Sequence, residues 1–192
     1  IVLDGFRVLV VHTGHDVTAG AIEYYQVVDI RAGSGFILSN SAVVDRTDRT
    51  FTGTHHAIAD GVDVIGGLAF FGCESLTEIT IPKSVTIIGD NAFSNCSALT
   101  SITIPDSVKT IGASAFYNCD SLTSISLPKD ITTIANSTFS NCDSLKSITI
   151  PEGVTTIDGN AFYACNALTS VTMPESITSI GQQAFRDCTS LT

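Results

Sequence analysis

The most reactive side chains in this sequence belong to six cysteines, and their spacing is regular. They follow one another at intervals of 23 residues: Cys73, Cys96, Cys119, Cys142, Cys165 and Cys188. Cysteines form disulfides or bind zinc only where their sulfurs converge. A fixed interval instead predicts one cysteine per turn of a repeating structure, about 4.8 Å from the next. The Cβ atoms of a disulfide are only about 3.5–4.5 Å apart, so we expect a column of free, buried thiols without zinc.

The four histidines all lie in the N-terminal third of the chain. His12 and His15 form an HxxH spacing, and His55 and His56 are neighbours. Because no cysteine or acidic residue completes a metal-ligand pattern, we interpret them as loop and cap residues and expect no metal and no cofactor. The sequence has no GxSxG nucleophile elbow and no phosphate-binding loop, which predicts that the protein is not an enzyme. A site in the N-terminal segment, where the histidines would have to converge, is the enzymatic alternative.

The cysteine interval belongs to a repeat that fills most of the chain. Five near-complete copies start at residues 76, 99, 122, 145 and 168, and a less regular copy starts at residue 53. The copy Leu99–Ser121 reads LTSITIPDSVKTIGASAFYNCDS. One proline occupies the same place in each near-complete copy: Pro82, Pro105, Pro128, Pro151 and Pro174. Self-similarity at a fixed period of this length predicts a solenoid.

Each copy has its own pattern of inward and outward positions. In LTSITIP the isoleucines alternate with polar residues, which predicts a strand that ends at Pro105. Gly112 suits a bend with positive φ. The segment ASAFYNC is expected to form one helical or 3₁₀ turn that directs Phe116 and Cys119 inward. One copy cannot bury these side chains alone, so the copies are expected to stack as rungs.

The outward positions of the strands predict a flat ladder of hydroxyl groups. We interpret this ladder as a candidate binding surface, and a polar face without a ligand is the alternative. A regular Ser/Thr array is also found in ice-binding solenoids, so ice binding is a further alternative. A protein that binds ice shows thermal hysteresis, whereas an adhesion protein does not. The candidate residues are Ser101, Thr103, Ser124, Ser126, Ser147, Thr149, Ser170 and Thr172.

The residue after the repeated phenylalanine is the most variable position that we expect to be exposed. From the first copy to the last it is Phe71, Ser94, Tyr117, Ser140, Tyr163 and Arg186. Tyrosine and arginine are enriched among residues that dominate binding interfaces. Tyr117 and Tyr163 are therefore further candidates for binding, and the alternative is that each tyrosine only packs over its own rung.

The pattern LxxIxIPxxVxxIGxxAFxxC resembles the BspA-like (Treponema-type) leucine-rich repeats of bacterial and protist surface proteins, over Gly53–Thr192. The resemblance implies a mostly β leucine-rich-repeat solenoid, with a parallel sheet on one face and short strands and helical turns on the other. It also implies an extracellular or cell-surface module that attaches to host proteins or to other cells. Glycans are further candidate ligands, and a structural spacer without a ligand is the alternative function.

Composition limits the partners and divides the chain into two parts. The formal net charge of −10 disfavours nucleic acid and anionic membrane surfaces as partners. No apolar run approaches the roughly 20 residues of a transmembrane helix. Residues 1–52 do not fit the repeat, and strands expected at 6–12 and 21–30 predict a β-rich cap or small domain before the repeats of 53–192. Nothing in the sequence fixes the oligomeric state.

Overall fold

The computed structural model describes Ile58 and residues 62–192, together with the backbone of five short strands nearer the N-terminus. These strands are β1 (Val2–Leu3), β2 (Phe6–Val10), β3 (Val27–Ile30), β4 (Val43–Val44) and β5 (Phe51–Thr52). The antiparallel sheet β1-β2-β3 contains the two strands expected in this part of the chain, and β4 pairs with β5. The role of residues 1–52 as a cap stays a prediction.

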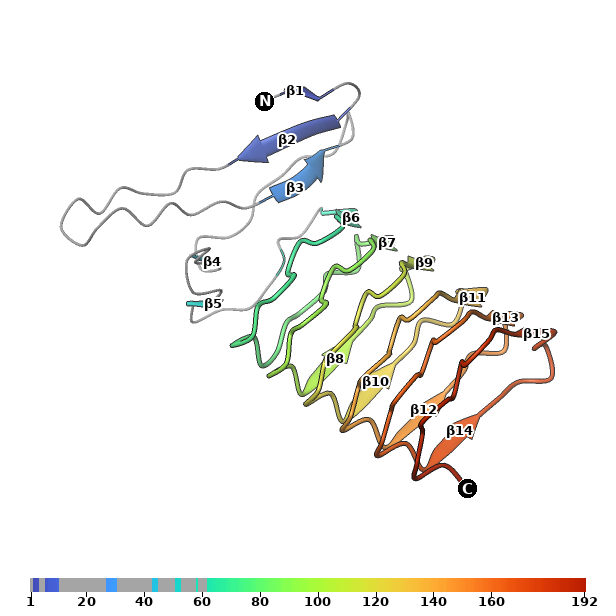
Figure 1. The fold of residues 1–192 in the computed structure, drawn as a ribbon. Helices are drawn as coiled ribbons and strands as arrows, with labels where there is room; N and C mark the ends of the chain where they lie inside the picture. Colours follow the sequence, from blue (N-terminus) through green and yellow to red (C-terminus); the bar gives the residue numbers. More distant parts are fainter. Residues whose placement is uncertain are drawn as a thin grey trace.

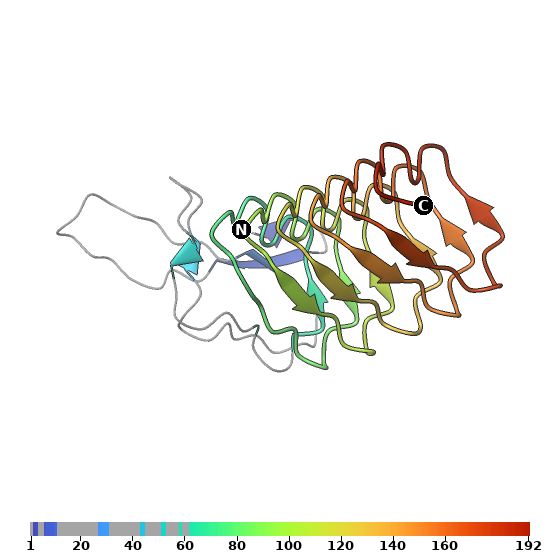
Figure 2. The same ribbon diagram turned by 90° about the horizontal axis from the view of Figure 1, so that it is seen from below.

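The repeats form a parallel β solenoid in which each turn contributes to two rows of strands on opposite sides (Figure 1). The first row consists of β8 (Ser101–Thr103), β10 (Ser124–Ser126), β12 (Ser147–Thr149) and β14 (Ser170–Thr172). The second row consists of β6 (Val64–Ile65), β7 (Ile87–Ile88), β9 (Thr110–Ile111), β11 (Thr133–Ile134), β13 (Thr156–Ile157) and β15 (Ser179–Ile180). Both rows run along the length of the solenoid (Figure 2).

The strands pair in parallel, in a register of one repeat. Ser124 pairs with Ser101 in the first row, and Ile157 pairs with Ile134 in the second. Equivalent residues therefore stack directly above one another, and every column of the sequence alignment becomes a column of side chains. In the first row the middle residue of each strand faces the core and its two neighbours face outward, as in β8, where Ile102 is buried between exposed Ser101 and Thr103.

The core consists of such columns. The phenylalanine rings from Phe70 to Phe185 stack with centroids 5.0–5.6 Å apart and nearly parallel planes. Phe93, Phe116, Phe139 and Phe162 are completely buried, as are the leucines that open each copy from Leu76 to Leu168. Burial of a large apolar side chain is worth about 1.5–3 kcal/mol. We therefore expect these columns to be the main source of stability.

The segment expected to form a helical turn contains no helix, and the described residues hold none anywhere. It forms a series of hydrogen-bonded turns in which alternate N–H groups have different partners. The N–H of Phe93 donates to the carbonyl of Ala115 on the next rung, whereas that of Cys96 donates to Phe93 on its own rung. Two residues per rung have positive φ, for example Asn91 and Asn95. A left-handed residue every fourth position interrupts a helix and directs donors to the neighbouring rung.

Glycine has a different role from the one that the sequence suggests. Gly112 does not have positive φ, and that conformation is adopted by residues two and six positions later. A Cβ at Gly112 would lie 2.4 Å from Asp90 Oδ1 and 2.6 Å from the backbone nitrogen of Asp90, on the preceding rung. Gly181 shows the same crowding against Gly159. Glycine at this position therefore permits two rungs to approach closely.

Candidate binding surface

The predicted hydroxyl ladder is present on the first row of strands, and we call it the hydroxyl face. All of its side chains are exposed: Ser101, Thr103, Ser124, Ser126, Ser147, Thr149, Ser170 and Thr172. The strands hold them in two parallel columns, because β10 pairs in register with β8 and β14 pairs in register with β12. Pro105 and its equivalents end the strands, so the face is narrow across the solenoid and long along its axis.

None of these hydroxyl groups forms a hydrogen bond to another of the residues that the structure describes. Threonines directly beside them behave differently. Thr100 Oγ1 donates to the carbonyl of Thr77 at 3.3 Å, Thr123 Oγ1 to Thr100 at 3.1 Å, and Thr169 Oγ1 to Lys146 at 3.0 Å. We call Thr100, Thr123 and Thr169 the ladder threonines. The ladder threonines connect successive rungs, whereas the donors and acceptors of the hydroxyl face are available to a partner.

The variable position after each phenylalanine, here called the tyrosine column, is less exposed than the sequence predicts. Ser94 and Ser140 are buried, with 1% and 3% of their surfaces exposed. Tyr117 and Tyr163 are half-buried, and Arg186 is exposed. Each buried serine lies one rung from a tyrosine on the same column. The prediction that this column is exposed is therefore wrong for the two serines.

Two acidic side chains lie three residues after the tyrosine column. Asp120 and Asp143 are exposed and occupy the same position on adjacent rungs. Asn166 Nδ2 donates to Asp143 Oδ1 at 3.0 Å. Burial of part of the carboxyl raises the pKa of Asp120, and the charge of Asp143 raises it further. No lysine or arginine among the described residues pairs with either carboxylate.

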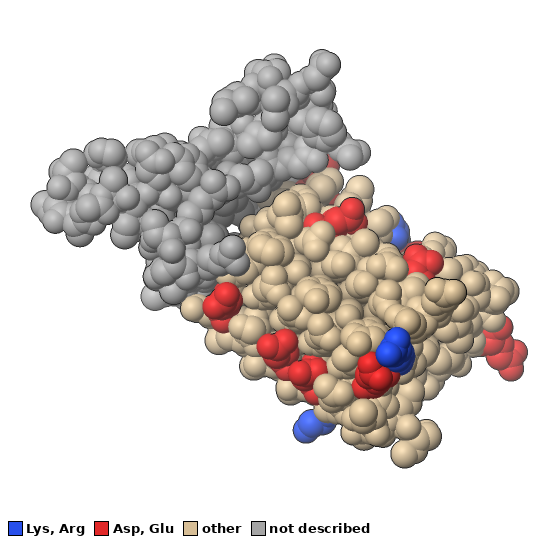
Figure 3. Space-filling model, viewed as in Figure 1, with Lys and Arg blue, Asp and Glu red and all other residues tan. Residues whose placement is uncertain are grey.

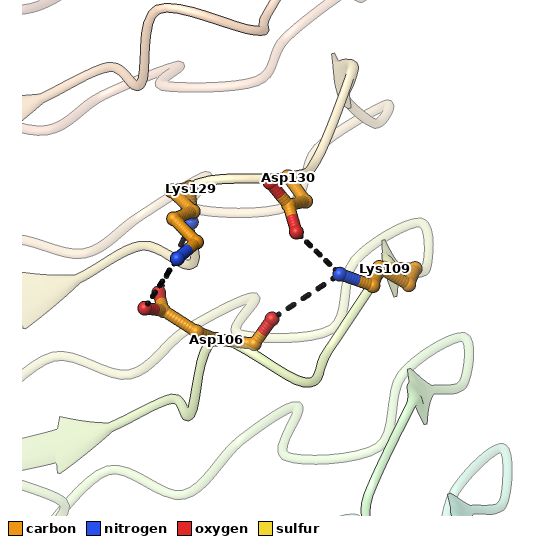
Figure 4. Close-up of polar contacts among 4 residues, drawn as sticks. All are labelled: Asp106, Lys109, Lys129 and Asp130. Atoms are coloured by element: carbon orange, nitrogen blue, oxygen red, sulfur yellow. Dashed lines mark hydrogen bonds and ion pairs between the residues drawn. The ribbon is translucent and has the colours of Figure 1, made fainter.

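The other charged residues are spread thinly over the repeats. In the view of Figure 3, small groups of acidic and basic side chains are separated by uncharged surface. One group joins two adjacent rungs (Figure 4): Lys109 contacts Asp130, and Lys129 Nζ lies 3.5 Å from Asp106 Oδ2. The hydrogen bond from Lys109 lowers the pKa of Asp130. These side chains are about half or more exposed, so we interpret the group as a weak link between rungs.

The cysteines form the predicted column of free thiols. From Cys96 to Cys188, each thiol donates to the carbonyl of a phenylalanine on the preceding rung, as Cys119 Sγ does to Phe93 at 3.2 Å. Burial raises the pKa of Cys73 and of Cys119 to about 12. Cys188, on the last rung, is only half-buried, and the neighbouring thiol of Cys165 lowers its pKa to about 7. The column is therefore chemically inert except at Cys188.

The described residues offer little other chemistry. They contain no group of three or more His, Cys, Asp or Glu that could hold a metal ion. The four histidines considered in the sequence analysis, His12, His15, His55 and His56, lie outside the described residues. Within the described part of the chain, no helix has the length and apolar character needed to cross a bilayer.

Comparison with known proteins identifies the repeats. Residues 63–192 match the BspA type leucine rich repeat region in six copies. The chain belongs to the BspA-type leucine-rich repeat family. The BspA-type repeats account for the solenoid and its period, and no catalytic family is indicated. No relative was found among the curated proteins.

Solved structures of bacterial proteins show the same fold. The T. pallidum leucine rich repeat protein TpLRR is 27% identical, with a TM-score of 0.59 over 83% of this chain and 87% of that chain. A leucine-rich repeat protein from Eubacterium ventriosum is 25% identical, with a TM-score of 0.68 over 83% of this chain and 51% of that one. A leucine rich cell surface protein from Faecalibacterium prausnitzii is 29% identical, with a TM-score of 0.50 over 71% and 57%. This BspA-type chain thus spans little more than half of the last two proteins.

The structure adds surface features that the sequence analysis did not single out. The carboxylates of Asp120 and Asp143 stand together only because the register stacks them. Asn95, Asn118 and Asn141 form an amide ladder, in which Asn118 Nδ2 donates to Asn95 Oδ1 at 2.9 Å and Asn141 Nδ2 donates to Asn118 Oδ1 at 2.8 Å. Asparagine tolerates positive φ better than most residues, so its recurrence two residues after the phenylalanine was a usable signal.

Proposed function

We propose that this chain is a cell-surface or secreted binding module that attaches to host proteins or to other cells through its repeat surface. The observation that carries the proposal is the hydroxyl face, where eight exposed side chains in two regular columns have no partner among the described residues. The ladder threonines beside it show that hydroxyls of this fold do find partners where the backbone offers them. A broad contact of many hydrogen bonds suits such a face better than a small molecule, which needs a concave apolar pocket.

The relatives support the location and the class of function. One similar structure is that of a leucine rich cell surface protein, and BspA-type repeats form a family of bacterial surface proteins that generally bind proteins. The chain has few basic residues and a net charge of −10, which favours proteins or neutral glycans over nucleic acid as partners. We infer a binding protein rather than an enzyme.

The test uses a panel of immobilised extracellular-matrix proteins and the full chain in solution. Wild type is expected to bind at least one member of the panel, and Ser124→Arg with Ser147→Arg is expected to weaken that binding at least about tenfold, because two bulky charges on the face block close approach. The matched control is Thr110→Arg with Ser179→Arg, which adds the same charge to exposed positions of the second row of strands. Circular dichroism checks that both variants are folded.

The outcomes separate the alternatives. If wild type binds no matrix protein and no cell surface, the spacer function replaces the binding function. If the face variant and its control bind equally well while both stay folded, the hydroxyl face is not the binding surface.

A further inference from the structure

One edge of the solenoid carries a column of alternating charge, which we call the charged edge. It lies where the chain turns after the repeated proline, between a strand of the first row and a strand of the second. The residue that follows the proline is exposed on each of these rungs. From the second rung to the sixth it is Lys83, Asp106, Lys129, Glu152 and Glu175. Because equivalent residues stack, the charges along this edge run plus, minus, plus, minus and minus.

The alternation is only partly used within the chain. Lys129 Nζ lies 3.5 Å from Asp106 Oδ2, and the two side chains are still 70% and 63% exposed (Figure 4). Lys83 and Glu152, at the two ends of the alternation, form no ion pair with the described residues. Contacts between neighbouring rungs therefore account for the middle of the column but not for its ends. All four charges are accessible to a partner.

An alternating column is complementary to itself when one copy is reversed. If the charged edge of a second copy faces it in the antiparallel direction, the second rung meets the fifth and the third meets the fourth. Lys83 of each copy then faces Glu152 of the other, and Asp106 of each faces Lys129 of the other. All four contacts of this two-fold symmetric arrangement join opposite charges. Since both copies have the same spacing between rungs, the match needs no particular ligand length.

Other arrangements of two copies bring like charges together. A parallel, in-register arrangement places every charge opposite its own equivalent. Moving the antiparallel copy by one rung places Lys83 opposite Lys129 in one direction and Asp106 opposite Glu152 in the other. A further rung in the second direction places Asp106 opposite Glu175. Because like charges directly opposed are unfavourable, the column selects one direction and one register.

We propose that the charged edge is a homophilic contact, through which two copies of this chain associate in antiparallel orientation with Lys83 of each opposite Glu152 of the other. The inference rests on the proposed binding function and names a partner for attachment to other cells, a second copy of the same module. Exposed ion pairs are individually weak and are screened by salt, so two isolated copies associate weakly. Many copies on two facing surfaces gain avidity from multivalency.

Sedimentation velocity of the full chain over a concentration series tests the proposal. Wild type is expected to dimerise at low ionic strength and at concentrations up to about 1 mM. An increase in salt from about 0.05 M to about 0.5 M should weaken the dimer at least about fivefold, because the contact is electrostatic. A chain that stays monomeric throughout the series overturns the proposal, and so does a dimer that salt does not weaken.

Charge reversal identifies the surface. Lys83→Glu and Glu152→Lys each oppose like charges in the symmetric dimer and should weaken dimerisation at least about tenfold. An equimolar mixture of the two variants should associate again, because each supplies the charge that the other needs, and the double variant should dimerise like wild type. Lys146→Glu is the matched control, since it reverses an exposed lysine away from the edge. Circular dichroism checks the fold. Single variants that dimerise like wild type, or a mixture that stays monomeric, overturn the proposal.

The same variants separate this inference from the proposed function. Lys83→Glu leaves the hydroxyl face intact and should bind matrix proteins like wild type. If the chain is monomeric and still binds matrix proteins through the hydroxyl face, the homophilic contact fails and the proposed function stands. If the charge reversals abolish dimers while no matrix protein binds wild type, the homophilic contact stands and the hydroxyl face loses its assigned role.

Discussion

Two sets of hydroxyl groups lie side by side on this solenoid and differ in their hydrogen bonds. Thr100 and Thr123 each donate to a carbonyl on the preceding rung, at 3.3 and 3.1 Å. Ser101 and Ser124, the next residues in the chain, are exposed and have no such partner among the described residues. The comparison shows that regularity alone does not identify function in a repeat protein. A column is structural where the neighbouring rung requires its residue type, and it is available for binding where no such requirement exists.

Among the structural columns, the largest expected effect is the pH dependence of stability that the buried thiols cause. Burial raises the pKa of Cys73 and of Cys119 from the ordinary value of 9.0 to about 12. Between these pH values only the unfolded state loses the proton, so stability falls as pH rises, by about 1.4 kcal/mol per pH unit for each thiol. We expect denaturation midpoints to fall steeply between pH 9 and 12. Cys119→Ala should make the decline shallower, and an unchanged slope would contradict the assignment.

The next largest effect is expected in the phenylalanine column. Phe116→Ala leaves a cavity between two stacked rings and should lower the free energy of unfolding by about 3–5 kcal/mol. Phe70, on the first rung, is 8% exposed, whereas Phe116 is completely buried. Phe70→Ala should therefore cost less in urea denaturation. Equal losses at the two positions would show that the first copy packs as tightly as the central ones.

Gly112→Ala tests whether close approach of the rungs requires glycine. A Cβ there would meet the backbone of Asp90, so we expect a loss of about 1–3 kcal/mol, the usual cost of overpacking. Gly153→Ala is the matched control, because its Cβ would come no closer than 3.3 Å to the carbonyl oxygens of Ile131 and Lys129. Thermal unfolding of both variants measures the difference. Similar midpoints would mean that the rungs adjust to the extra methyl group.

The charged group of Figure 4 should show the smallest effect. Lys109 lowers the pKa of Asp130, so any stability that the contact contributes is present above the ordinary carboxyl pKa and is lost as pH falls through the lowered one. Because both side chains are about half exposed, the contact is expected to be weak. Asp130→Asn should therefore change the thermal midpoint only slightly, and only above about pH 4. Calorimetry at pH 3 and pH 7 measures this. A large shift at pH 7 would show that the contact is a structural requirement.

The repeat made most of the fold predictable, because every copy repeats the same buried positions. The strand before Pro105, the phenylalanine column and the free thiols all follow from one period and the alternation of side chains along a strand. The turn segment was not predictable in this way: ASAFYNC has helix-compatible residues, and only stacking reveals that every second N–H bonds to the next rung. The bend with positive φ predicted at Gly112 was wrong for a similar reason. What requires glycine there is the close approach of Asp90 on the preceding rung, which the sequence of a single copy does not reveal.

The candidate surface was predictable in part. Strand alternation placed Ser124 and Ser147 outward, and the structure agrees. The variability of its column predicted an exposed Ser140, whereas the structure buries it. Whether the hydroxyl face and the tyrosine column bind a partner remains a prediction.

The most direct test of the central claim compares the two sets of hydroxyls in one experiment. One variant carries Thr100→Ala, Thr123→Ala and Thr169→Ala, and the other carries Ser101→Ala, Ser124→Ala and Ser147→Ala. Unfolding free energy and affinity for the tightest-binding matrix protein are measured for both. The threonine variant should lose about 1–3 kcal/mol of stability, from three hydrogen bonds, and keep its affinity. The serine variant should keep its stability within about 0.5 kcal/mol and lose at least about fivefold in affinity. A serine variant that is destabilised like the threonine variant, or that binds like wild type, would contradict the assignment of the hydroxyl face as the binding surface.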